Sequence, residues 1–132
     1  MKKILVVLIL LCTSISVCAE VMLFRSQTYS ERRYNGYSWS NWKPEVKSSV
    51  LIKIDPDAEL VTIYSPVTQY YNVTGVDDVY TDGDGDRVLT FYFVDGDGDE
   101  GIMHLMARKS GRYEIYIRFG NIQWVYSVRR IQ

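Results

Sequence analysis

The sequence predicts an all-β fold, an antiparallel up-and-down meander of about eight strands. Two observations carry this prediction. Hydrophobic residues alternate with polar residues along most of the chain, and turn-forming residues separate the alternating stretches at short intervals. The alternation is clearest at 112–119, where Tyr113, Ile115, Ile117 and Phe119 fall on one face. A period of two residues is typical of a strand with one buried face.

The expected strands follow one another in a regular order. Alternating or β-branched stretches predict strands at 21–29, 46–54, 60–64, 69–74, 88–94, 102–107, 112–119 and 122–129. Asp55-Pro56-Asp57 supplies turn chemistry after the second strand, and Gly120-Asn121 suits a tight hairpin between the last two. The segment 31–43 is the least regular and is expected to be a long loop or a distorted strand.

A closed architecture would bury the edges of this sheet. Eight strands in sequential order can form a small barrel, which leaves no exposed edge. A two-sheet β-sandwich is the alternative that the pattern leaves open. About 113 residues remain after the leader described below, enough for one ordinary domain. We therefore expect a single domain at 20–132.

Residues 1–19 are expected to be a signal peptide. Lys2 and Lys3 precede an apolar run at 4–11 that is too short to span a bilayer, and 17–19 offers a small-x-small cleavage site. This pattern is typical of bacterial export to the periplasm or the extracellular medium. The alternative is a lipoprotein anchored through a lipidated Cys18.

Cleavage would also remove both cysteines. The chain contains two, Cys12 and Cys18, and both lie in the leader. The mature domain is therefore expected to have no disulfide, no thiolate nucleophile and no cysteine-bound zinc. No later stretch is long and apolar enough to predict a transmembrane segment.

The string DGDGD occurs twice, at 82–86 and 95–99. Carboxylates at alternate positions can direct oxygens toward one Ca²⁺ ion, but Asp-Gly is also a favoured hairpin dipeptide. The spacing of an EF-hand is not matched, so bends without an ion are the simpler interpretation. If one string binds calcium, the better candidate ligands are Asp95, Asp97, Asp99 and Glu100, whose charges would repel one another without a cation.

The two strings are expected to stand at opposite ends of the domain. The strand between them has about seven residues of roughly 3.3 Å each, which separates its ends by roughly 20 Å. Calcium–oxygen bonds are only about 2.4 Å long, so the strings cannot share one ion.

The charge is unevenly distributed along the chain: nine acids and one base lie between Asp77 and Glu100, and six bases and one acid follow. Acidic loops and basic strand faces are the simpler explanation; steering of a charged partner is the alternative.

The segment RRYNGYSWSNW, at 32–42, is the best candidate for a binding surface. Tyr34, Tyr37, Trp39 and Trp42 can stack on sugar rings or fill a pocket of a partner, and arginine mixed with aromatic residues is typical of interface hot spots. The alternative is that these rings cap one end of the barrel as part of its core.

The residues give little support to catalysis. The single histidine, His104, falls on a predicted strand, and the common nucleophile and zinc motifs are missing. The slightly acidic chain also argues against nucleic acid. We expect an exported, non-enzymatic β-domain, without a cofactor, that binds a protein, a glycan or a small apolar partner. A calcium-stabilised structural module is the second hypothesis, and a small hydrolase with an unidentified acid pair is the third.

Two resemblances accompany this interpretation. By architecture the predicted barrel resembles lipocalins, small exported barrels that carry apolar ligands. Their Gly-x-Trp motif is not matched, because two residues separate Gly36 from Trp39, and no ligand is carried over. The stretches VLIKID, LVTIYSPVTQYYNV and IYIRFGNIQWVYSV resemble small secreted proteins of unassigned function from Bacteroidetes-type bacteria and their phages. That resemblance implies no activity and no site residues.

Overall fold

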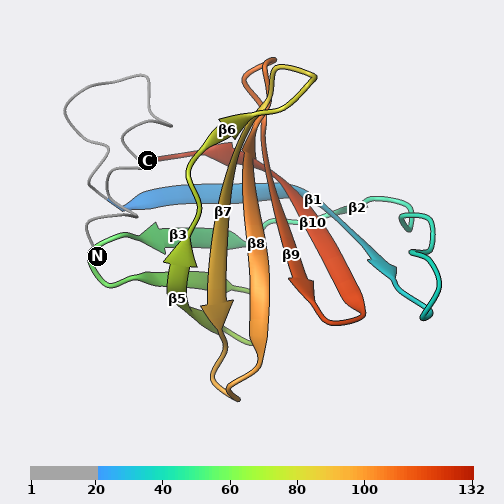
Figure 1. The fold of residues 1–132 in the computed structure, drawn as a ribbon. Helices are drawn as coiled ribbons and strands as arrows, with labels where there is room; N and C mark the ends of the chain where they lie inside the picture. Colours follow the sequence, from blue (N-terminus) through green and yellow to red (C-terminus); the bar gives the residue numbers. More distant parts are fainter. Residues whose placement is uncertain (1–20) are drawn as a thin grey trace.

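The computed structural model describes residues 21–132, and every regular element in this range is a β-strand (Figure 1). The strands are β1 (Met22–Arg33), β2 (Val46–Lys47), β3 (Leu51–Asp55), β4 (Leu60–Tyr64), β5 (Gln69–Val76), β6 (Tyr80–Thr81), β7 (Arg87–Val94), β8 (Glu100–Ala107), β9 (Tyr113–Phe119) and β10 (Ile122–Arg130). The predicted leader at 1–19, with both cysteines, lies outside the described residues. Within the described range, no helix is long and apolar enough to cross a membrane.

Eight of the strands close into one antiparallel barrel. The ring runs β1, β3, β4, β5, β7, β8, β9, β10, and β10 pairs again with β1. The closing seam extends from the pair Phe24–Arg130 to the pair Arg33–Ile122 and leaves neither strand with a free edge there. The predicted all-β meander and small barrel are confirmed, and the two-sheet alternative is wrong.

A bulge in β1 explains where the structure departs from the predicted strands. The register shifts between Ser26 and Thr28. Beside this bulge, the Ser26 hydroxyl accepts a hydrogen bond from the Val50 amide at 2.8 Å and lies 2.8 Å from the Ser48 hydroxyl. The predicted strand at 46–54 is therefore divided into β2 and β3, which pair with different parts of β1. β1 itself continues to Arg33, into the segment expected to be irregular.

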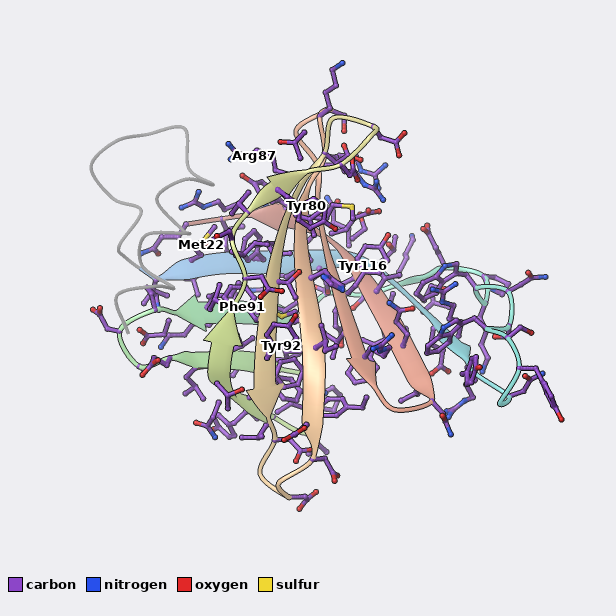
Figure 2. The ribbon with its side chains drawn as sticks, in the orientation of Figure 1. Met22, Tyr80, Arg87, Phe91, Tyr92 and Tyr116 are labelled. Atoms are coloured by element: carbon purple, nitrogen blue, oxygen red, sulfur yellow. The ribbon has the colours of Figure 1, made fainter. Side chains whose placement is uncertain are left out.

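The barrel interior is filled with side chains. All eight strands of the ring contribute to a core whose buried members are at most 7 % exposed. On β7, Phe91 points into this core and is fully buried, whereas Tyr92 points outward and is 38 % exposed (Figure 2). An eight-stranded barrel has an interior just wide enough to be filled in this way.

Three aromatic rings close the end of the core near the β7–β8 loop. Tyr71, Phe93 and Phe119 pack with ring centroids 4.6, 5.6 and 5.2 Å apart. Gly101 on β8 makes room for two of them, because a Cβ at this position would lie 2.7 Å from the Phe93 ring and 2.9 Å from the Phe119 ring. The absence of a side chain at Gly101 therefore allows the rings to cross close to the backbone.

Three hairpin loops share one backbone conformation: 82–86, 95–99 and 108–112. In each loop the amide of the fourth residue donates to the carbonyl of the first, and the amide of the first donates to the carbonyl of the fifth. The fourth residue is always a glycine, with φ of 84° at Gly85 and Gly98 and 93° at Gly111. This is a type I turn followed by a left-handed residue, a common hairpin loop.

The three loops lie at alternate ends of the barrel. They connect β6 to β7, β7 to β8 and β8 to β9, at equal spacing along the chain. The first and third lie together beyond one end of β7, and the second lies beyond the other end (Figure 1). The prediction that the two DGDGD strings stand at opposite ends of an extended strand is confirmed.

Candidate functional site

The predicted aromatic segment forms an ordered loop at the end of β1. Asn35 organises the loop, because its Oδ1 accepts hydrogen bonds from the amides of Tyr37 and Ser38 at 2.9 and 3.0 Å. Gly36 follows with φ of 97°, a value that favours glycine. Tyr34 and Trp39 form an isolated antiparallel bridge across the loop. The chain therefore reverses direction tightly between the two bridge residues, and Tyr37 is part of this turn.

The chain then returns alongside β1. The Ser40 amide donates to the Arg33 carbonyl at 2.7 Å, and the Lys43 amide donates to the Glu31 carbonyl at 2.9 Å. These bonds fix the position of Trp42, whose ring meets Tyr116 of β9 at a centroid distance of 6.1 Å. Tyr116 alternates with the core residues of β9, so this contact lies on the outer face of the barrel.

Arg32 joins the two tryptophans of the segment. Its guanidinium carbon lies 5.0 Å from the centroid of the Trp39 ring and 4.5 Å from that of the Trp42 ring. Both distances fall within the range of cation–π attraction. Its Nε donates to Oε1 of Gln123 on β10 at 2.9 Å. The segment named from the sequence begins with Arg32, but sequence reasoning missed Gln123, because its pairing with Arg32 depends on the β1–β10 seam.

The four predicted aromatic residues do not form one exposed patch. Trp39 and Trp42 are half-buried and joined through Arg32, Tyr34 packs on Trp39 at 5.5 Å, and Tyr37 is 93 % exposed. None of these four residues belongs to the buried core of the described chain. The alternative that they cap the core is therefore wrong.

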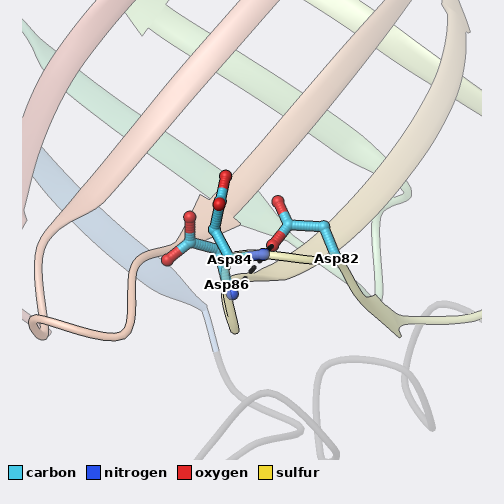
Figure 3. A group of neighbouring side chains, drawn as sticks. All are labelled: Asp82, Asp84 and Asp86. Carbon is cyan, nitrogen blue, oxygen red and sulfur yellow. Dashed lines mark hydrogen bonds between the residues drawn. The ribbon is translucent and has the colours of Figure 1, made fainter.

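Each acidic string brings three carboxylates together. In 82–86 (Figure 3) and in 95–99, one oxygen from each aspartate lies within 4.8 Å of the others. The leading aspartate organises each loop. Oδ1 of Asp82 accepts hydrogen bonds from the amides of Asp84 and Asp86 at 3.0 Å, and the second loop repeats the pattern at 2.9 Å.

The predicted calcium ligands are only partly brought together. Asp95, Asp97 and Asp99 form one group, whereas Glu100, the first residue of β8, does not belong to it. The string at 82–86, which the sequence favoured less, forms an equivalent group. The loop 108–112 follows the same backbone path without a single carboxylate. The loop conformation therefore requires neither the aspartates nor a cation.

The last aspartate differs between the two acidic loops. Asp86, with a side chain only 7 % exposed, accepts hydrogen bonds from the Lys109 amide and from Nη1 of Arg108, both at 2.8 Å. The amide and then the guanidinium hold the pKa of this carboxyl below its ordinary value. Among the described residues, the carboxylate of Asp99 has no hydrogen bond or ion pair. In the described part of the chain, the last carboxylate is thus paired with the neighbouring loop at 82–86 and unpaired at 95–99.

The imidazole of His104 on β8 contacts the side chain of Thr90 on the neighbouring strand β7. Its Nδ1 lies 2.9 Å from the hydroxyl of Thr90, which is only 6 % exposed. Burial lowers the pKa of His104, and the nearby charge of Arg118 lowers it further. The contact between His104 and a nearly buried hydroxyl favours a structural role for both residues.

No family model, curated protein or solved structure matches this sequence. The resemblances to lipocalins and to small secreted bacterial proteins therefore stay predictions. What the candidate sites can do follows from their geometry.

Proposed function

We propose that this protein is exported from a bacterial cell and acts outside the cytoplasm, without catalysis. It binds a protein partner through its aromatic loop, residues 32–42. The observation that carries the proposal is the state of Tyr37, whose side chain is 93 % exposed on a loop held by Asn35. An exposed tyrosine offers a large contact area with few rotatable bonds. An ordered loop also loses little conformational entropy when it binds.

A protein partner fits this loop better than a glycan does. A sugar ring stacks on an open aromatic face. Trp39 already contacts Tyr34 and Arg32, and Trp42 contacts Arg32 and Tyr116. These internal contacts use much of the tryptophan surface that a sugar would need. Tyr37 remains, and a single projecting ring is better suited to a pocket in a protein than to a row of sugars.

The packed interior favours a protein partner over a small apolar ligand. Ligand-carrying barrels need an internal chamber, but here Phe24, Phe91 and Met103 are fully buried among core residues from every strand of the ring. The outer surface is therefore the better place for a binding site.

Affinity capture tests the proposal. The mature domain is immobilised and exposed to envelope and medium fractions of the source cells. The change Tyr37→Ala is expected to weaken capture of the specific partner by about thirtyfold, the effect of roughly 2 kcal/mol at a hot spot. Tyr64→Ala removes another exposed tyrosine, 43 % exposed on β4, and is expected to leave capture unchanged. Equal capture by both variants would refute the role of the loop.

The proposed export has its own measurement. Mass spectrometry of the processed protein is expected to show a chain beginning at Glu20. A chain beginning at a lipidated Cys18 would show a membrane-anchored lipoprotein instead. A chain that retains residues 1–19 inside the cell would contradict export.

A calcium-stabilised module is the second candidate. It is favoured by the two aspartate triads, because oxygens within 4.8 Å of one another can supply part of the shell of about six to eight oxygens that Ca²⁺ prefers. It is opposed by the loop 108–112, which folds in the same way without carboxylates. If either triad binds, millimolar CaCl₂ raises the midpoint of thermal unfolding. An unchanged midpoint removes this candidate.

A further inference from the structure

A hollow lies at the end of the barrel and is lined by residues of the β7–β8 loop and of the β9–β10 hairpin. Its volume is about 560 Å³, within the range of small-molecule sites. One side is apolar, formed by Phe119, Ile122 and Trp124, and the other carries Asp95, Asp99 and Glu100. Two opposite kinds of surface therefore face the same space.

The apolar wall is fixed by the barrel core. The Trp124 and Phe119 rings stack with centroids 5.9 Å apart and planes 20° from parallel. Phe119 packs in turn against Phe93 in the core at 5.2 Å. The rings of Phe119 and Trp124 are therefore held in place by the core before any ligand binds. The faces of such rings carry a negative potential and attract cations.

The acidic side has little internal compensation. One oxygen of Asp95 accepts two amide hydrogen bonds within its loop. The carboxylates of Asp99 and Glu100 have no hydrogen bond or ion pair among the described residues. At the other end of the barrel Arg108 pairs with Asp86, the residue that corresponds to Asp99, and also with Glu114. The carboxylates of Asp99 and Glu100 therefore stay available for a ligand beside the hollow.

We propose that this hollow binds an organic cation, an ammonium group joined to an aliphatic stem. The carboxylates accept charge-assisted hydrogen bonds from the ammonium group, while the stem packs on Ile122 and Trp124. An anion is repelled by both surfaces. A bare Ca²⁺ ion would need oxygen ligands on the side that the rings occupy. Tyr37 does not line this hollow, and the proposal does not rest on the protein partner proposed above.

Trp124 fluorescence provides the test. The chain has three tryptophans, so the double change Trp39→Phe and Trp42→Phe leaves Trp124 as the single reporter. The probes are n-pentylamine, which is an ammonium ion at neutral pH, and n-pentanol, which has the same stem without the charge. The amine is expected to give a saturable change, with an affinity at least about tenfold higher than that of the alcohol.

Two charge variants in the same background locate the site. Asp99→Asn is expected to weaken binding of n-pentylamine about threefold to tenfold. Asp84→Asn removes the same charge from the loop of identical conformation at the opposite end and is expected to leave the affinity unchanged. Asp99 makes no side-chain hydrogen bond or ion pair in the described structure, so Asp99→Asn should not disturb folding.

The source of the ammonium group is distinguished by a second probe. A tripeptide Gly-Lys-Gly with blocked ends presents the same group as a lysine side chain. Binding as tight as that of n-pentylamine indicates a polypeptide source, and loss of binding indicates a free amine. Three results would overturn the proposal. The affinities for n-pentylamine and n-pentanol could be equal, or Asp84→Asn could weaken binding of n-pentylamine as much as Asp99→Asn does. CaCl₂ could also compete more strongly for the site than n-pentylamine or the lysine tripeptide does.

Discussion

Asp86 and Asp99 occupy the same position in two loops of the same conformation, yet their surroundings give them different roles. Asp86 is held by Arg108 and by the Lys109 amide from the neighbouring loop 108–112. Asp99 stands at the end where the neighbouring turn, Gly120-Asn121, offers no cationic side chain. The sequence shows two identical strings, and only the order of strands around the barrel shows which string meets a basic loop.

The pairing of Asp86 predicts a difference between two otherwise equivalent substitutions. Asp86→Asn is expected to lower the midpoint of thermal unfolding, because it removes one of the two charged partners of Arg108, the other being Glu114. Asp99→Asn, at the same loop position, is expected to leave the midpoint nearly unchanged. Differential scanning fluorimetry at neutral pH measures both. A larger loss for Asp99→Asn would contradict the assignment of roles.

The same pairing predicts a dependence on pH. The folded state lowers the pKa of Asp86 from its ordinary 3.8, so its ionised form stabilises the fold. The stability difference between the wild type and Asp86→Asn is expected to be full above that value and to shrink as pH falls through the lower, folded-state pKa. Urea unfolding between neutral and strongly acidic pH tests this. A difference that grows on acidification would have the wrong sign.

At the scale of elements, strands were easier to predict than their partners. The alternation of Tyr113, Ile115 and Ile117 was enough to find β9, since it depends only on one buried face. The bulge between Ser26 and Thr28 was not predictable, because it is accompanied by contacts of the Ser26 hydroxyl with Ser48 and Val50, far along the chain. The loops 82–86, 95–99 and 108–112 are equally spaced along the chain. The sequence does not show that the third adopts the conformation of the first two, because it does not contain the string DGDGD.

Gly101 gives the clearest prediction about an element. Gly101→Ala places a methyl group 2.7 Å from the Phe93 ring and 2.9 Å from the Phe119 ring, which forces the packed rings or the strands that carry them to shift. Overpacking of this kind costs about 1–3 kcal/mol of unfolding free energy. Gly96→Ala, with no atom within 4 Å of the new Cβ, is the matched control and is expected to cost less than about 0.5 kcal/mol. Urea unfolding that gave equal values for both would contradict the packing.

For the molecule as a whole, the sequence predicted a small barrel, with a two-sheet sandwich as the alternative, but not the way in which closure assembles the aromatic site. Local alternation suggested eight strands, and the cost of free edges suggested a barrel. The seam between the first and last strands brings Arg32 to Gln123, and the return of the chain brings Trp42 to Tyr116. The role of the four aromatic residues stays a prediction. Their division into packed rings, with Trp39 and Trp42 joined through Arg32, and a projecting Tyr37 needed the three-dimensional structure.

The same seam predicts that the aromatic loop and the barrel unfold together. Arg32 connects the loop to β10, and Trp42 connects it to β9. Trp124 does not belong to the loop, and its ring stacks on Phe119 at the end of the barrel core. A small barrel with one continuous core should unfold in a single transition. The variant Trp124→Phe reports the loop through its remaining tryptophans, and the double variant Trp39→Phe, Trp42→Phe reports the barrel end. In each variant, the urea midpoints from fluorescence and from far-ultraviolet circular dichroism are expected to coincide. If loop fluorescence changes at a lower urea concentration than circular dichroism does, the loop is an independent flap, and the low entropy cost of binding through Tyr37 no longer follows.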